Sequence, residues 1–115
     1  MLKVYGIPNC NTVKKAMDWL KNHDIGYEFH DYKKKGISQE KLDAWLTQVS
    51  YEKLINRAGT TYKNLSDEEK NAIIDNKSAI ELMLNKTSVI KRPIVESDKI
   101  LVVGFKEEDY GAIFE

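Results

Sequence analysis

With 115 residues, this chain is long enough to bury the core of one compact domain but short for two domains of ordinary size. Hydrophobic residues make up 42% of the chain and charged residues 31%, which is ordinary for a soluble globular protein. The 18 basic residues balance 18 acidic ones, so the net charge predicts no bulk attraction to nucleic acid or to an anionic membrane.

The sequence also bears on location and on metal binding. No stretch approaches the roughly 18 consecutive apolar residues of a membrane helix, and the start of the chain lacks the apolar core of a signal peptide. We therefore expect a cytoplasmic protein with no membrane partner. The single cysteine, Cys10, excludes an internal disulfide framework and argues against a cysteine-based zinc site, because structural zinc usually draws several thiolates. We expect no metal.

The first part of the chain predicts a β-α-β unit. Leu2–Tyr5 alternates apolar and other residues as a short strand does, and Pro8 then marks a turn. An apolar stripe at helical spacing predicts a helix over Asn11–Asn22. Tyr27–Asp31 alternates like a second strand, which should run parallel to the first. Cys10 therefore stands where a strand leads into a helix.

The middle of the chain is predicted to be helical. A Ser38 cap precedes apolar residues at helical spacing, and Ser66–Glu69 matches a capping box. Helical spacing resumes after a break near Asn76. The basic run Lys33–Lys35 is expected to be a solvated loop without a function of its own.

The end of the chain predicts a hairpin and a final helix. Two β-rich runs, Ile94–Val95 and Ile100–Val103, flank the turn residues Ser97–Lys99, and a helix is expected over Glu107–Phe114. The order β-α-β, helical insertion, β-β-α indicates an α/β protein of thioredoxin-like (glutaredoxin-like) fold with a four-stranded mixed sheet. We expect a single domain over residues 1–115, with the helical insertion at about residues 38–87.

The local pattern leaves two interpretations of Cys10. It can be a small buried hydrophobic residue, or it can be a reactive thiol, because unpaired N–H groups and the helix dipole at a helix N-terminus favour the thiolate. Lys14, four residues further on, shares the same helical face and could add positive charge, although a solvated surface residue is the favoured interpretation. Since there is no second cysteine, a mixed disulfide on Cys10 would be resolved by an outside thiol.

Several motifs resemble those of the ArsC/Spx/YffB family of thioredoxin-fold proteins, in the same order and over nearly the whole chain. They are Gly-Ile-Pro-Asn-Cys-Asn-Thr-Val-Lys-Lys-Ala (Gly6–Ala16), Ile-Lys-Arg-Pro-Ile-Val (Ile90–Val95) and Val-Val-Gly-Phe (Val102–Phe105). The segments closest to the YffB branch are Tyr27–Tyr32 and Gly59–Leu65. The resemblance implies that Cys10 is the catalytic nucleophile, that Arg92 faces it as a second catalytic residue, and that Pro93 follows a cis peptide bond.

The resemblance to YffB implies a redox enzyme, a glutathione-dependent thiol reductase of the thiol-disulfide oxidoreductase class. Cys10 would form a mixed disulfide, with glutathione as co-substrate and no metal. An arsenate reductase and a non-catalytic, Spx-like regulator that binds RNA polymerase are the alternatives. The residues expected to contact the substrate or glutathione are Asn9, Asn11, Thr12, Lys14, Arg92 and Pro93, with Arg57 as a further candidate.

The sequence also departs from the family pattern. Arsenate reductases of this family use three arginines around the cysteine, but no arginine stands near Gly104–Phe105, where the last one is expected. YffB-like sequences place an arginine directly before Gly-Thr-Thr, whereas this chain has Ala58 there and Arg57 one position earlier. Val13 replaces the second cysteine of the Spx Cys-x-x-Cys switch, which excludes an internal disulfide switch.

Overall fold

The computed structural model describes residues 2–98 and 100–114. The chain forms two compact units: Met1–Tyr32 together with Arg92–Glu115, and Lys33–Lys91. The first unit holds the sheet, and the second is built from helices. The second unit takes in the predicted insertion at about residues 38–87, with borders slightly wider on both sides. The assignment of one domain to the whole chain stays a prediction.

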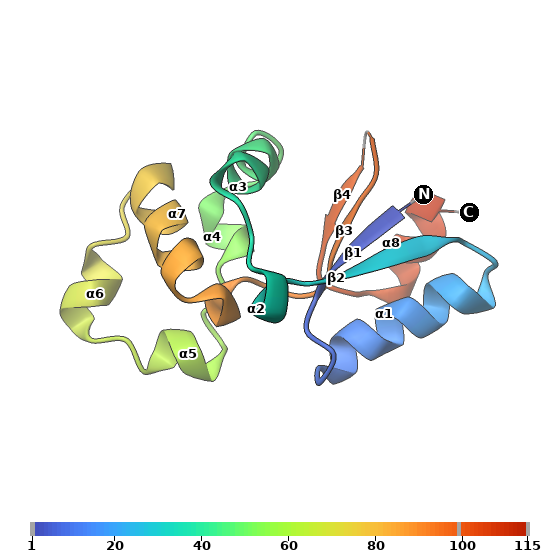
Figure 1. The fold of residues 1–115 in the computed structure, drawn as a ribbon, viewed down its shortest axis with the longest axis horizontal. Coiled ribbons are helices and arrows are strands. Elements are labelled where there is room, and N and C mark those ends of the chain that lie inside the picture. Colours follow the sequence, from blue (N-terminus) through green and yellow to red (C-terminus); the bar gives the residue numbers. More distant parts are fainter. Residues whose placement is uncertain (1, 99, 115) are drawn as a thin grey trace. The chain divides into compact units, whose positions relative to one another are not determined.

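The four strands of the first unit form one mixed sheet in the order β2-β1-β3-β4 (Figure 1). Strand β1 pairs in parallel with β2, whereas the β1–β3 and β3–β4 pairs are antiparallel. The sheet therefore confirms the predicted thioredoxin-like arrangement. The strands are β1 (Leu2–Gly6), β2 (Tyr27–Asp31), β3 (Ile94–Glu96) and β4 (Leu101–Val103).

Two helices, α1 (Asn11–Asn22) and α8 (Glu107–Phe114), cover one face of this sheet (Figure 1). Both helices match their predicted bounds. The apolar stripe of α1 meets side chains of β1, β3 and α8 in one buried cluster, which excludes water from this face. The most central members of the cluster are Val4, Ala16, Leu20, Val95 and Tyr110, each with 0% exposure.

Strand pairing brings three segments to the same edge of the sheet. Gly6 pairs with Asp31, so the carboxyl ends of the parallel strands β1 and β2 lie side by side. Tyr5 pairs with Ile94, so the amino end of the antiparallel strand β3 lies at that edge as well. The segment after β1 leads to α1, and the segments after β2 and before β3 meet it there.

The predicted hairpin is formed by β3 and β4, which pair through Val95 and Val102. The N–H of Ser97 donates to the carbonyl of Ile100 at 2.9 Å and closes the turn. Lys99, which was included in the predicted turn, lies outside the described residues.

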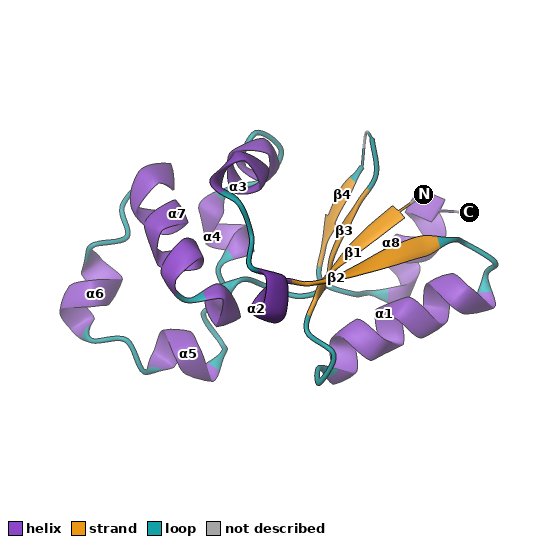
Figure 2. Cartoon of the chain, in the orientation of Figure 1, coloured by secondary structure: helices purple, strands orange, loops and turns teal. Residues whose placement is uncertain are grey.

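The second unit packs short helices around an apolar core (Figure 2). Its fully buried residues include Leu42, Trp45, Leu54, Met83 and Val89. The helices are α3 (Gln39–Leu46), α4 (Tyr51–Leu54), α5 (Thr60–Lys63), α6 (Asp67–Asn71), α7 (Asn76–Asn85) and the 3₁₀ turn η1 (Thr87–Val89). Within this unit, the residue after α4 and the residue after η1 are joined by an isolated antiparallel β-bridge between Ile55 and Ile90.

The predicted caps of the second unit are confirmed. The Oγ atom of Ser38 accepts from the N–H of Lys41 at 3.1 Å at the start of α3. Ser66 and Glu69 form a complete capping box on α6. The break predicted near Asn76 falls just before that residue, because Asp75 is the N-cap of α7 and Asn76 is its first helical residue.

The basic run Lys33–Lys35 was wrongly predicted to be a loop. It forms the short helix α2 (Tyr32–Lys35), although its three lysines are exposed as expected. Lysine has good helix propensity, and Gly36, whose φ is +74°, follows the turn in the left-handed region that commonly ends a helix. None of the described helices is long and apolar enough to cross a membrane.

Candidate thiol active site

Cys10 is the N-cap residue of α1 and is partly exposed. Its extended backbone, with φ −109° and ψ 122°, turns the chain from the loop into the helix. The first turn of α1 contains no acidic residue to oppose a negative charge on the sulfur. The thiol therefore lies at the positive end of a helix of 12 residues.

Glycine at position 6 allows α1 to begin close to the end of β1. A Cβ atom at Gly6 would lie 2.8 Å from Cγ2 of Val13, closer than real side-chain contacts allow. Val13 is fully buried in the first turn of α1. The close approach of these two residues fixes the start of the helix, and with it Cys10, against the sheet.

The pKa of the Cys10 thiol is lowered by its surroundings. Partial burial raises this pKa, but the Val13 N–H, the Arg92 guanidinium and the Thr12 N–H all favour the thiolate and together lower the pKa by more. The sulfur makes no capping hydrogen bond of conventional geometry, so we interpret the two backbone groups as dipoles that attract the thiolate. A lowered thiol pKa is the direction expected for the reactive Cys10 of our prediction. Lys14 is not among these causes and its side chain is exposed, so a contribution of its charge to Cys10 stays a prediction.

Arg92 provides the positive side chain of the site. Burial lowers the pKa of its guanidinium, but hydrogen bonds to the Tyr32 oxygen and to the Cys10 sulfur outweigh burial and raise that pKa. The Arg92–Pro93 peptide bond is cis, as the resemblance implied, and Pro93 is buried. The predicted facing of Arg92 and Cys10 is thus present in the structure.

Tyr32 is a member of this site that we did not predict. Its side chain has 0% exposure and accepts a hydrogen bond from Arg92. Burial raises the pKa of the Tyr32 phenol, Arg92 lowers it, and the nearby Cys10 and Asp31 raise it again, so the group is neutral at physiological pH. The signal was available in the sequence, because Tyr32 directly follows the strand that we expected to be parallel to the strand before Cys10.

The remaining predicted contact residues have two locations. Asn9, Asn11, Thr12 and Lys14 lie within four residues of Cys10 in the chain and are exposed. Arg57 belongs to the other unit, where its side chain is 57% exposed and its Nη2 atom lies 3.8 Å from Oε2 of Glu52. The binding roles of all these residues stay predictions.

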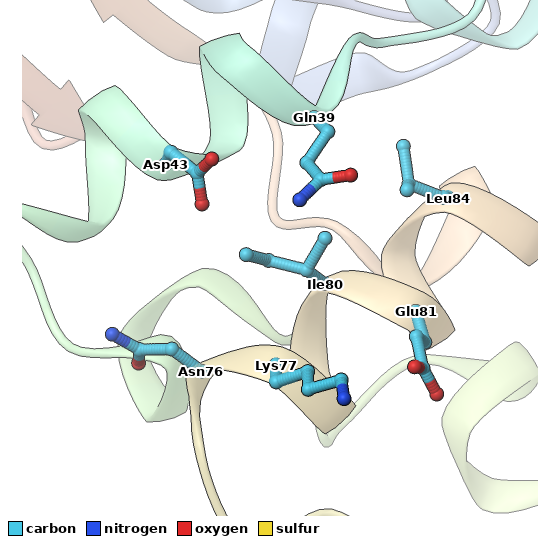
Figure 3. Close-up of a pocket in the computed structure, with 7 residues that line it drawn as sticks. All are labelled: Gln39, Asp43, Asn76, Lys77, Ile80, Glu81 and Leu84. Atoms are coloured by element: carbon cyan, nitrogen blue, oxygen red, sulfur yellow. The ribbon is translucent and has the colours of Figure 1, made fainter.

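The second unit contains a separate cavity of about 320 Å³ between α3 and α7. In Figure 3, Gln39 and Asp43 of α3 face Ile80 of α7 across this space. Its other lining residues are Asn76, Lys77, Glu81 and Leu84. The described part of the chain contains no cluster of three or more His, Cys, Asp or Glu residues that could hold a metal ion.

The mixed sheet, the helix that follows β1, and the thiol at its N-cap define a thioredoxin-like protein of α/β class. The model of the ArsC family matches residues 5–113. The chain therefore belongs to the ArsC family.

Three relatives illustrate the range of the family. A solved YffB protein is 45% identical, with a TM-score of 0.91 and 97% of each chain covered. An arsenate reductase (ArsC) related protein from Brucella melitensis is 49% identical, with a TM-score of 0.78, over 99% of this chain and 94% of that one. A global transcriptional regulator Spx from Lactiplantibacillus plantarum is 26% identical over 95% of this chain and 83% of its own.

Proposed function

We propose that this protein is a glutathione-dependent thiol-disulfide oxidoreductase in which Cys10 is the nucleophile. The observation that carries the proposal is the joint placement of Cys10 at the N-terminus of α1 and beside the Arg92 guanidinium. Both features favour the thiolate, which is the attacking form of cysteine. The choice of glutathione rests on the resemblance of the sequence motifs to the YffB branch.

The simplest substrate is a mixed disulfide between glutathione and a second thiol. The Cys10 thiolate attacks the glutathione sulfur, a Cys10–glutathione disulfide forms, and the second thiol leaves as its thiolate. The thiolate of another glutathione then attacks the glutathione sulfur on Cys10, which releases oxidised glutathione and restores the Cys10 thiolate. Because the sequence has one cysteine, an outside thiol is required for this second step.

Intact mass measurement tests the first step. After incubation with oxidised glutathione, we expect one glutathionyl adduct on the wild-type protein and none on Cys10→Ser. Glutathione-coupled turnover of a glutathionylated peptide then tests the full cycle. Absence of both the adduct and the turnover would refute the proposal, whereas an adduct without turnover would indicate thiol modification without catalysis.

An arsenate reductase is the second candidate, and the name of the Brucella melitensis relative favours it. The Cys10 thiolate would attack arsenic and displace one arsenate oxygen, which leaves as water, while Arg92 would bind the oxyanion through its guanidinium. Two glutathione thiols would supply the two electrons that reduce arsenate to arsenite and would leave as oxidised glutathione, which restores Cys10. Arsenate-dependent oxidation of glutathione by the purified protein separates this candidate from the first.

A non-catalytic, Spx-like regulator is a candidate of a different class, favoured by the match to a global transcriptional regulator. In this role the chain would bind RNA polymerase, and Cys10 would not turn over. Capture of purified RNA polymerase together with no glutathione-coupled turnover would support this role against the enzymatic ones.

A further inference from the structure

We propose that the buried Tyr32 hydroxyl is a positioning group, which holds the Arg92 guanidinium against the sulfur of Cys10. The inference rests on the proposed function because it assigns a role within the same thiol site. It adds the residue that directly follows β2 to a site otherwise formed by the N-terminus of α1 and the segment before β3.

The sheet places Tyr32 where this role requires it. Asp31, the residue before Tyr32, pairs with Gly6 at the carboxyl end of β1. Ile94, two residues after Arg92, pairs with Tyr5 at the same edge. The pairing of β1 with β2 and with β3 therefore brings together Tyr32, which directly follows β2, and Arg92, which precedes β3, at the end of the sheet where the chain leaves β1 toward Cys10.

Arg92 is the hydrogen-bond donor in both of its contacts within this site. A guanidinium has only donors, so Arg92 donates to both the Tyr32 oxygen and the Cys10 sulfur. Its planar fork offers several N–H groups in fixed geometry, and fixing one of them on a buried oxygen restricts where the others point. The Tyr32 side chain has 0% exposure, so the residues packed around it restrict the position of its ring.

A neutral hydroxyl suits this position better than a carboxylate would. A carboxylate beside Arg92 would form an ion pair and offset the positive charge that the thiolate uses. The neutral phenol accepts a hydrogen bond and leaves the charge of Arg92 available to Cys10. Asp31 is the further charged group that acts on Tyr32, and it is adjacent in the chain.

The test is a double-mutant cycle on the alkylation rate of Cys10 as a function of pH. Tyr32→Phe keeps the ring and removes the hydroxyl. We expect its alkylation midpoint to move to higher pH and its rate below the midpoint to fall about three- to tenfold, since one pKa unit corresponds to a tenfold change. In an Arg92→Ala background, the same tyrosine substitution should change the rate by less than about twofold, because its effect passes through Arg92.

Tyr110→Phe is the matched control. Tyr110 is another fully buried tyrosine of the same unit, but its hydroxyl donates to the carbonyl of Gly104 at 2.9 Å. We expect its alkylation profile to equal that of the wild type. The proposal is overturned if Tyr32→Phe leaves the profile unchanged, if it shifts the profile equally with and without Arg92, or if the control shifts it as much.

Circular dichroism establishes that each variant is folded. If Tyr32→Phe does not fold, Tyr32→Leu takes its place, because leucine is also apolar and lacks the hydroxyl. A raised midpoint that disappears in the Arg92→Ala background supports the proposal, and a wild-type midpoint overturns it. Alkylation requires no glutathione, so a protein with the expected cycle but without glutathione turnover refutes the proposed function and leaves the role of Tyr32 intact.

Discussion

The guanidinium of Arg92 donates a hydrogen bond to the sulfur of Cys10, although the two residues stand near opposite ends of the chain. Arginine stays protonated throughout the range in which a thiol titrates. The positive charge beside Cys10 is therefore constant, and the pH dependence of the site reports the ionisation of the thiol rather than that of its partner.

The alkylation midpoint of Cys10 should lie below about 8.5, the ordinary value of a free cysteine. The reason is that Val13, Arg92 and Thr12 together lower the pKa of the thiol more than partial burial raises it. The rate of reaction with iodoacetamide, measured from acid to alkaline pH, gives the midpoint. Cys10→Ser should not react, since the chain has no other cysteine. A midpoint at or above the ordinary value would contradict this prediction.

The lowered pKa of Cys10 also sets the sign of its effect on stability. Between the folded and unfolded pKa values, the unfolded state binds more protons, so the stability due to this group rises with pH in that range. It is fully present above the unfolded pKa and is lost as pH falls through the folded pKa. The free energy of unfolding of Cys10→Ser should lack this dependence.

Gly6→Ala should impair both the fold and the thiol. The new Cβ atom would meet the buried Val13 at 2.8 Å, and such overpacking typically costs about 1–3 kcal/mol. Because Val13 contributes an N–H group to Cys10, a displaced α1 should also raise the alkylation midpoint. Urea unfolding and the alkylation profile measure the two effects.

Gly36→Ala is the control for general loss of stability. Gly36 has φ +74° with open space around it, so alanine there is strained by the backbone alone, at about 1 kcal/mol. We expect this variant to be destabilised but to keep the wild-type alkylation profile. Equal thiol effects in the two variants would show that the Gly6–Val13 contact has no special role.

The sequence predicts the elements that have a clear period or cap. The apolar stripe of α1 and the capping box at Ser66–Glu69 are local signals, and the structure contains both. Helices α4 and α5 have four residues each, too few to show a 3.6-residue period, and they were not predicted. They are held by tertiary packing of residues such as Leu54, which a local pattern does not reveal.

The site could be predicted only in part for a related reason. Cys10 has a local signal because it stands between a strand and a helix, whereas the partnership of Arg92 with Cys10 came from family resemblance. The parallel pairing predicted for the first two strands already placed Tyr32 near the strand before Cys10, but its approach to Arg92 depends on the register of β1 with β3, which the sequence did not reveal. Strand order and register depend on residues that are far apart in the chain, so a short stretch of sequence does not reveal them.

Asp75→Ala should destabilise the helix α7 in a pH-dependent way. The N–H and the hydroxyl of Ser78 bind the Asp75 carboxylate and lower its pKa. The stabilisation is therefore present above the unfolded pKa and is lost as pH falls through the folded pKa. We expect the denaturant midpoint of the variant to fall below that of the wild type at neutral pH and to approach it in acid.

Asp75→Asn separates the hydrogen bond from the charge. Asparagine is as good an N-cap as aspartate, so this variant should stay close to the wild type at neutral pH and lose less stability in acid. Circular dichroism in urea at several pH values provides the comparison. If alanine and asparagine gave the same midpoint at every pH, the cap at Asp75 would have no measurable role.

Arsenate should be a poor substrate of this protein. The chain has two arginines, Arg57 and Arg92, whereas the family resemblance leads us to expect three around the cysteine of an arsenate reductase. The guanidinium of Arg92 already donates to Cys10 and Tyr32. Each missing charge-assisted hydrogen bond to the oxyanion is worth about 1.5–3 kcal/mol, or roughly ten- to a hundredfold in affinity.

Arsenate-dependent oxidation of glutathione by the purified protein should therefore stay near the rate of Cys10→Ser, under conditions in which a glutathionylated peptide is reduced. Arsenate turnover as fast as peptide turnover would show that fewer than three arginines are sufficient, and would favour the arsenate reductase over the thiol reductase.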